Sequence, residues 1–402
     1  MNDIQATPGT TPKVAFVLPC LNEARTIEWC VRRARSALDL LAERHGMTGE
    51  VIVADNGSTD GSQTIAQAAG ARVVPVRRRG YGAALIGGFD ASDADFLVMG
   101  DSDCSYDFLE AAAMVEELMA GAEFCMGSRF RGEIKPGAMP WKNRYIGNPV
   151  LSGLLRFLFR THISDSHCGM RAIRADAYRV LNLSSTGMEF ASEMVLKAVL
   201  RGMSIAEVPV TLSPDGRDRP PHLNPWRDGL RHLAYMLLLS PRHLFLWPAS
   251  VALVFGLVIF ALLFSAGGNG MASIGSLQFG DHWAVAASAA ISIGVQTAIF
   301  GLLAMIYAYQ KGYRLPTARS RWFLRQSRLE RWLALGLLMV LTGLAWAGSI
   351  TFGWIASSFG TLNEIRSLIA AATIIVTGFQ VIFAGFLVSI LAGNRSAHLH
   401  AV

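Results

Sequence analysis

Four long runs without charge most constrain what this chain can fold into. Asp, Glu, Lys and Arg are absent from residues 244–280, 282–310, 332–363 and 367–394. A helix needs about 20 apolar residues to cross a bilayer, so each run is long enough for one crossing. A large buried core is the alternative, but a soluble domain does not normally hold four such stretches, and their Gly and Ala content suits close packing of membrane helices. We therefore expect an all-α domain of four transmembrane helices at 245–265, 284–309, 333–355 and 368–391.

The connecting segments predict the orientation in the membrane, because Lys and Arg concentrate in cytoplasmic loops. Residues 311–331 carry seven basic residues against one Glu, whereas residues 266–282 contain no Lys or Arg. The first segment should face the cytoplasm and the second the outside. With an even number of crossings, the N-terminal domain and the tail 395–402 should both be cytoplasmic, in an inner or plasma membrane.

Bulk composition excludes several other classes. Residues 1–12 lack an apolar core and indicate a loose leader rather than a signal peptide. The five cysteines have no zinc or disulfide spacing, and we assign them no role: Cys20, Cys30, Cys104, Cys125 and Cys168. The formal net charge of +6 is explained by the basic loop at 311–331, which favours anionic lipid headgroups over nucleic acid as a partner.

The first half of the chain alternates short apolar runs with helical patterns. Strands are expected at 14–18, 50–54, 72–76 and 96–99, and helices at 24–45 and 58–69. This alternation predicts a largely parallel sheet with helices on its faces, in which ligands bind at the carboxyl ends of the strands. We expect an α/β domain at 13–221, a juxtamembrane amphipathic helix at 222–243, and the membrane domain at 244–394.

Candidate ligand-binding residues follow each predicted strand. In order they are Pro19, Leu21, Asn22 and Glu23, then Asp55, then Gly80 and Gly82 after three arginines, then Asp101 and Asp103 in the sequence DSD. Each loop alone is explained as well by ordinary turn and helix-capping chemistry. The carboxylate pair alone is better explained as a turn than as a divalent-cation site. Four such loops in succession are much harder to explain by chance.

These motifs resemble those of family 2 glycosyltransferases with a GT-A, Rossmann-like nucleotide-sugar domain. The resemblance is to the polyprenyl-phosphate branch typified by dolichyl-phosphate mannose synthase, and it covers about residues 13–235. It implies that VLPCLNE and ADNGSTDGS contact the nucleotide, with Asp55 on the base, and that Asn56 replaces a second Asp. It also implies that Asp101 and Asp103 hold Mg²⁺ or Mn²⁺, because a cation neutralises the charge that develops on the diphosphate leaving group.

The resemblance also assigns the acceptor side. GSRF, NRYIGN and SDSHCGMRAIR are similar to segments that imply lipid-phosphate contacts for Arg129 and Arg144, and a structural or lipid-phosphate role for Arg171. A surface cation is otherwise the usual fate of an arginine. The resemblance implies catalytic roles for Asp165 and, with the metal, Asp103. Glu193 matches an acidic family position, but a carboxylate on a helix surface explains it as well. Residues 145–159 and 226–239 are candidate amphipathic helices at the membrane surface.

The expected activity is that of an inverting, metal-dependent hexosyltransferase. It transfers sugar from a UDP- or GDP-linked donor to a polyprenyl phosphate of undecaprenyl or dolichyl type, giving a lipid-linked sugar for a cell-envelope glycan. A polyprenyl phosphate is largely dianionic at neutral pH, so it needs little help from a base. Two alternatives stay open: a processive polysaccharide synthase, and a non-catalytic scaffold that binds nucleotide or lipid. Homo-oligomerisation is open as well.

Overall fold

The computed structural model describes residues 11–216, 225–266, 271–310, 317–360, 362 and 364–392. The chain divides into two compact units, Met1–Met236 and Leu237–Val402. The expectations for the leader, for residues 222–224 and 311–316, and for the tail fall wholly or mostly outside the described residues.

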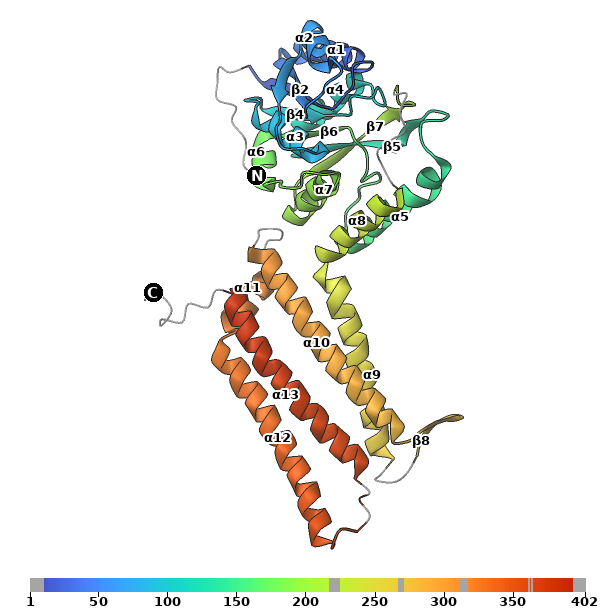
Figure 1. The fold of residues 1–402 in the computed structure, drawn as a ribbon, viewed down its shortest axis with the longest axis vertical. Helices are drawn as coiled ribbons and strands as arrows, with labels where there is room; N and C mark the ends of the chain where they lie inside the picture. The colour runs from blue at the N-terminus through green and yellow to red at the C-terminus, as the bar shows by residue number, and fades with distance from the viewer. Residues whose placement is uncertain are drawn as a thin grey trace, which may run out of the picture. The chain divides into compact units, whose positions relative to one another are not determined.

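A seven-stranded sheet with the order β3-β2-β1-β4-β6-β5-β7 forms the centre of the first unit (Figure 1). The strands are β1 (Lys13–Cys20), β2 (Thr48–Asp55), β3 (Arg72–Pro75), β4 (Phe96–Met99), β5 (Phe124–Ile134), β6 (Arg171–Arg174) and β7 (Ile205–Leu212). Only β6 runs antiparallel to its neighbours β4 and β5, and the other pairings are parallel. The carboxyl ends of β1, β2, β4 and β5 therefore lie at one edge of the sheet, together with the beginning of β6.

Helices cover both faces of this sheet, which explains why β1 is a continuous apolar run rather than an alternating one. Val14, Phe16 and Leu18 belong to the core shared with α1 (Ile27–His45) and α4 (Ala111–Met119). Val17 faces α3 (Tyr81–Asp90), where Gly88 allows so close an approach that an added Cβ would lie 2.4 Å from Val17 Cγ1. The remaining helices and turns of this unit are α2 (Ser62–Ala68), η1 (Phe108–Glu110), η2 (Asn143–Gly147), α5 (Asn148–Phe159), α6 (Ala175–Leu181), α7 (Glu189–Arg201) and α8 (Pro225–Leu238).

The expected strands and helices of this domain are confirmed, with differences of up to four residues at their ends. The largest difference is at the second expected helix, 58–69, because the DNGSTDG segment stays in a loop until Gly61 and α2 begins only at Ser62. Both candidate amphipathic segments are helical: α5 with the preceding turn η2 covers 143–159, and α8 covers 225–238.

In the described part of the second unit, four helices are long and apolar enough to cross a membrane. They are α9 (Trp247–Ser265), α10 (His282–Gln310), α12 (Leu329–Ala356) and α13 (Ile365–Ala392), and the turn η3 (Arg242–Leu246) precedes α9. A short hairpin, β8 (Ala272–Ile274) and β9 (Leu277–Phe279), and helix α11 (Ala318–Gln326) lie between them. All four expected transmembrane helices are confirmed, and α12 begins four residues earlier than expected.

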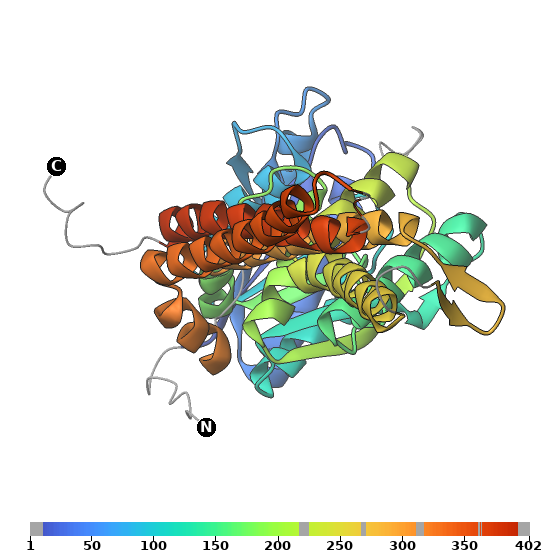
Figure 2. The same ribbon diagram turned by 90° about the horizontal axis from the view of Figure 1, so that it is seen from below.

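Glycines bring the membrane helices close together, as in many membrane proteins. Helix α12 packs along α13, and α10 packs along both α9 and α13 (Figures 1 and 2). An added Cβ on Gly336 of α12 would lie 2.7 Å from the carbonyl oxygen of Gly378 on α13. Glycines of the uncharged runs thus lie where the helices contact each other.

Candidate active site

Three of the predicted donor-side loops meet at one edge of the sheet. β1 and β2 pair in parallel up to Asp55, and β4, on the other side of β1, leads into the loop with Asp101 and Asp103. Ser102 Oγ donates to the carbonyl oxygen of Pro19 at 2.7 Å, which ties this loop to the end of β1.

Asp55 is held rigidly as a hydrogen-bond acceptor. Its carboxylate accepts from the backbone N–H groups of Gly57 (3.0 Å) and Ser58 (3.1 Å) and from Gln63 Nε2 (3.0 Å). Burial alone would raise the pKa of Asp55, but the hydrogen bonds from Ser58, Gln63 and Gly57 outweigh it and lower the pKa below its usual value. The carboxylate is therefore ionised and fixed in orientation.

Two asparagines join neighbouring loops. Asn22 Oδ1 accepts from the N–H of Thr59 at 2.8 Å. Asn56 donates through Nδ2 to the carbonyl of Arg78 at 2.8 Å and accepts through Oδ1 from the N–H of Gly80 at 2.7 Å. An aspartate at position 56 could not donate to that carbonyl, so the structure gives a physical reason for the asparagine found there.

The other predicted nucleotide residues differ in exposure. Leu21 is 38 % exposed, whereas Glu23 is buried and its backbone N–H donates to Ser62 Oγ at 2.9 Å. Gly80, with φ of 126°, and Gly82 face the protein's own chain. An added Cβ would lie 2.2 Å from the carbonyl oxygen of residue 186 at Gly80, and 2.3 Å from that of residue 185 at Gly82. These glycines seat segment 185–187 against α3.

The DSD loop is contacted from two sides. Tyr81 Oη donates to Asp101 Oδ1 at 3.0 Å. Gly169 lies so close to this carboxylate that an added Cβ would be 2.4 Å from Asp101 Oδ2. Asp103 accepts from the N–H of Ser105 at 3.0 Å and is mostly buried.

Two carboxylates suit a magnesium or manganese ion that completes its shell with phosphate and water. Among the described residues, no three His, Cys, Asp or Glu side chains are grouped to hold a metal. Mg²⁺ typically takes one or two carboxylates and several substrate or water oxygens, so Asp101 and Asp103 fit that donor set.

On the acceptor side, Arg129 and Asp165 form a buried ion pair. The guanidinium donates to both carboxylate oxygens, at 2.6 Å from Nε and 2.7 Å from Nη2, and the Arg129 backbone N–H adds a third bond at 3.1 Å. Asp165 is 0 % exposed and Arg129 is 8 % exposed. Two residues predicted for separate roles are therefore partners.

This pairing sets the charge of Asp165. Burial would raise the pKa of Asp165, but the hydrogen bonds and positive charge of Arg129 outweigh that effect and lower the pKa below its usual range. A carboxylate that is stabilised as an anion is a weak base. The geometry thus favours a positioning role for Asp165 over proton removal.

Arg171 is fully buried, and its donors are directed at backbone carbonyls. They bond to Cys168 O at 2.9 Å, Ala191 O at 2.5 Å and Ser166 O at 3.2 Å. Burial lowers the pKa of Arg171. In this arrangement Arg171 braces the loop that carries Asp165 against helix α7.

Arg144 is the most available of the three predicted phosphate ligands. It lies in η2, is partly exposed, and its guanidinium carbon stands 5.5 Å from the centre of the Tyr145 ring. It forms no ion pair with a carboxylate within the described part of the chain.

A pair of histidines links the same loop to α8. The rings of His167 and His232 meet edge to face at 5.0 Å, His167 Nδ1 lies 2.9 Å from Ser166 Oγ, and His232 Nδ1 lies 2.6 Å from Ser192 Oγ. Burial, with the nearby His232 and Arg129, lowers the pKa of His167 to about 3. No sequence signal places His167 against His232.

Glu193 is buried, so its interpretation as a surface carboxylate is wrong. It pairs with Lys197 at 2.7 Å and accepts from the backbone N–H of Ser185 at 2.8 Å. Opposite charges four residues apart on a helix are a signal that could have predicted this pair. Asp107 caps η1, accepting from the Leu109 N–H at 3.0 Å.

Comparison with known proteins supports the family resemblance independently of the motifs. Residues 15–181 match the model of glycosyl transferase family 2, and residues 302–392 match that of the glycosyltransferase family 2 C-terminal transmembrane region. The low-salt glycan biosynthesis hexosyltransferase of Haloferax volcanii is 34 % identical over 96 % of this chain and 91 % of its own length.

Two further similarities are shorter. The dolichyl-phosphate hexose transferase of Haloferax volcanii is 32 % identical over 51 % of this chain and 84 % of its own length. The crystal structure of glucosyl-3-phosphoglycerate synthase from Mycobacterium tuberculosis, in complex with Mn²⁺, UDP and glucosyl-3-phosphoglycerate, is 25 % identical with a TM-score of 0.44, covering 56 % of this chain and 79 % of that one.

The full-length relative and both family models agree with the strand-end motifs and the four apolar helices. The chain belongs to glycosyltransferase family 2, and it carries the family's C-terminal transmembrane region.

Proposed function

We propose that this membrane glycosyltransferase moves a hexose from a nucleotide sugar to a polyprenyl phosphate and releases a nucleoside diphosphate. The observation that carries the proposal is the close approach of Gly169 to Asp101 Oδ2. This contact brings the carboxylates proposed for the donor diphosphate next to the loop that holds Asp165, the partner of Arg129 on β5. Donor and acceptor phosphates would then meet across one short gap.

On the donor side, the strand-end loops bind the nucleotide. Asp55, fixed by backbone N–H groups, accepts from the base, and the segment Pro19–Glu23 with the loop at Gly80 borders the nucleoside. Asp101 and Asp103 hold Mg²⁺ or Mn²⁺. When bound, the cation neutralises the negative charge that develops on the departing diphosphate.

On the acceptor side, Arg144 binds the lipid phosphate, because it is partly exposed and its guanidinium can grip phosphate oxygens in pairs. Arg129 adds positive charge from the wall of the site, where Asp165 fixes its orientation. The contacts of Arg171 favour bracing this loop over the phosphate contact predicted for it.

The acceptor phosphate is its own nucleophile, since its second pKa is about 6 and it is mostly dianionic at neutral pH. One phosphate oxygen attacks the anomeric carbon as the bond to the diphosphate breaks, which inverts that carbon. Asp165, ionised and paired, orients Arg129 and removes no proton. A single displacement needs no covalent intermediate on the protein.

Two features support a lipid acceptor. A relative of this chain is a dolichyl-phosphate hexose transferase. Within the catalytic unit, η2 and α5 expose large apolar side chains, including Tyr145 at 66 % and Phe157 at 69 %. Such a face beside Arg144 suits the surface of a membrane. The basic segment 311–331 favours the cytoplasmic side.

A direct test uses purified enzyme, Mg²⁺ or Mn²⁺, a polyprenyl phosphate and a panel of radiolabelled nucleotide sugars. The proposal expects one labelled sugar in the organic phase as a lipid-linked monosaccharide. A water-soluble polymer would identify a processive synthase. Absence of product with every donor would refute the proposal, and tight nucleotide binding in that case would indicate a scaffold.

A further inference from the structure

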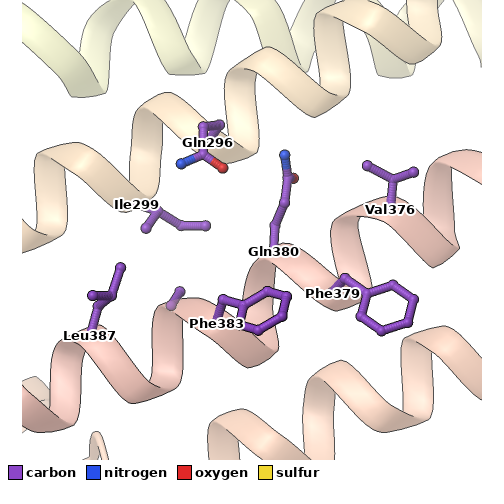
Figure 3. A pocket seen from close by; sticks show the side chains of 8 residues that line it. Gln296, Ile299, Val376, Phe379, Gln380, Phe383 and Leu387 are labelled. Atoms are coloured by element: carbon purple, nitrogen blue, oxygen red, sulfur yellow. The ribbon is translucent and has the colours of Figure 1, made fainter.

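A cavity of about 350 Å³ lies between two membrane helices, α10 and α13. Its lining is mostly apolar and includes Phe379 and Phe383, but two glutamines stand in the middle of it. Gln296 is near the centre of the 29-residue α10, and Gln380 is near the centre of the 28-residue α13. Both amide groups extend into the space between the helices (Figure 3). Small-ligand pockets typically combine about 300 Å³ or more, apolar walls and a few converging polar groups.

The amide of Gln380 is poorly satisfied. Its Nε2 donates to the carbonyl of Ser292 over a long 3.4 Å, and its buried Oε1 has no hydrogen-bond partner among the described residues. An unpaired acceptor in the middle of a bilayer is costly, because lipid chains offer no donor. A molecule with a hydroxyl group in this cavity would supply one.

A seam of polar contacts runs from this cavity to one end of the two helices. Thr373 Oγ1 of α13 donates to Ser288 Oγ of α10 at 2.7 Å, about two turns from the glutamines. Farther along, Arg366 at the start of α13 pairs with Asp281 at 2.7 Å, just before α10.

The order of the crossings gives the seam a direction. Asp281 comes after one crossing, α9, and Arg366 comes after three, so both lie on the side of the bilayer that is reached by an odd number of crossings from the N-terminal unit. The polar contacts occupy the half of the crossing that a product made on the catalytic side has still to traverse.

The chemistry of the cavity fits a monosaccharide. A sugar ring carries hydroxyl groups that can donate to Gln380 Oε1 and accept from the amide N–H groups of Gln296, and it has apolar C–H faces that suit Phe379 and Phe383. The side chains of Phe379 and Phe383 are 47 % and 63 % exposed, so the cavity opens toward the lipid phase, where an attached isoprenoid chain would remain. A plain lipid chain would fill the space but leave Gln380 Oε1 without a donor.

We propose that the cavity binds the sugar headgroup of the lipid-linked product, and that the α10–α13 seam lets that headgroup pass to the opposite leaflet. This second function rests on the proposed function for the identity of the headgroup. It is an exchange between leaflets that follows the concentration gradient and needs no energy source. Arg366 stands at the far end, where the single phosphate charge of the product would arrive.

The test uses the full-length enzyme in sealed liposomes that contain a polyprenyl phosphate, with the nucleotide sugar and Mg²⁺ added outside only. Product is then made in the outer leaflet, and periodate, which does not cross the membrane, reports how much sugar stays accessible. With wild-type enzyme the product is expected to become protected until the leaflets are balanced. Gln296→Leu/Gln380→Leu should make the same amount of product but protect it roughly tenfold more slowly, as expected for two lost hydrogen bonds.

Thr342→Val is the matched control, because this exposed hydroxyl of α12 bonds only within its own helix, to Leu338 O at 2.8 Å. It should behave as wild type. Should the double variant misfold in detergent, Gln380→Met alone is measured instead. Product that stays fully accessible with wild-type enzyme, or glutamine variants that protect it at the wild-type rate, would overturn the inference. Preformed lipid-linked hexose placed in the outer leaflet tests the passage separately, even if the enzyme makes no product.

Discussion

The donor and acceptor halves of the proposed site are built by opposite means. On the donor side, Asp55 is fixed by neutral groups within eight residues along the chain, mostly backbone N–H groups. On the acceptor side, Asp165 is fixed by the charged Arg129, 36 residues away, with both side chains out of water. A neutral hydrogen bond contributes about 0.5–1.5 kcal/mol and can be lost singly. A buried ion pair fails abruptly when one partner is removed, because the other charge is left unpaired.

This contrast teaches where each half is vulnerable. Substitutions on the donor side should change the chemistry and leave the fold intact, whereas those on the acceptor side should disturb fold and chemistry together. The variants below separate these effects, beginning with the largest.

Asp103→Asn should lower kcat/KM for transfer by about 10³-fold or more, because it removes half of the proposed cation charge site. The amide has the same shape, so membrane insertion and the thermal midpoint should hardly change. Radiolabel transfer by purified enzyme with saturating Mg²⁺ checks the activity. Asp176→Asn, at a mostly exposed carboxylate of α6, is the control. Wild-type-like turnover by the Asp103 variant would remove the metal role.

Breaking the Arg129–Asp165 pair should lower the stability of the folded protein. Arg129→Met or Asp165→Leu alone is expected to cost about 3–5 kcal/mol of stability, seen as a lower thermal midpoint in detergent. The double variant should recover most of that stability, because no buried charge remains unpaired, yet it should not recover transfer. If the double variant transferred sugar normally, the pair would have a structural role only.

The neutral His167 makes stability depend on pH. Its folded-state pKa of about 3 is below the ordinary value of about 6.5, so between these values the unfolded chain binds a proton that the folded chain does not. Stability from this source is complete above pH 6.5 and is lost as pH falls toward 3. Between pH 7 and 5 the loss is about 2 kcal/mol. His167→Gln should flatten that part of the midpoint–pH curve, and an unchanged slope would contradict the buried neutral ring.

Arg144→Ala should raise KM for the lipid acceptor roughly tenfold, the effect of losing one charge-assisted contact. KM for the nucleotide sugar should stay the same, because the donor loops lie on other strands. Arg179→Ala, at an exposed position on α6, removes the same charge elsewhere. An equal loss of nucleotide affinity would indicate that Arg144 contacts the donor nucleotide sugar rather than the lipid acceptor.

The same contrast explains what the sequence could predict. Strands and spans were predictable because each is a local pattern: β1 is a run of apolar residues between polar ends, and α9 is a long run without charge. The loop around Asp55 was predictable because its partners are its neighbours. Such local patterns can be recognised because the residues that interact are neighbours in the sequence.

Contacts between segments that are far apart in the sequence could not be predicted in this way. Nothing in GSRF or SDSHCG shows that Arg129 and Asp165 bond to each other, because the pairing arises only when β5 and the loop before β6 reach the same edge of the sheet. Gly80 and Gly82 were expected to lie close to a ligand. A glycine in the sequence indicates that some group can approach closely, but it does not identify that group. The structure shows segment 185–187 there.

Tyr81→Phe should have the smallest effect, and it examines the place where the two halves touch. The variant removes one hydroxyl, whose hydrogen bond to Asp101 Oδ1 is 3.0 Å long, and keeps the ring that fills the space. A neutral donor to a carboxylate contributes about 1–2 kcal/mol, so kcat should fall several-fold, with unchanged stability and lipid KM. Because Gly169 restrains the other oxygen of Asp101, the carboxylate should keep its place but lose part of its orientation. A loss as large as that of Asp103→Asn would mean that the tyrosine hydroxyl, and not the cation, is the main group that stabilises the negative charge on the leaving diphosphate.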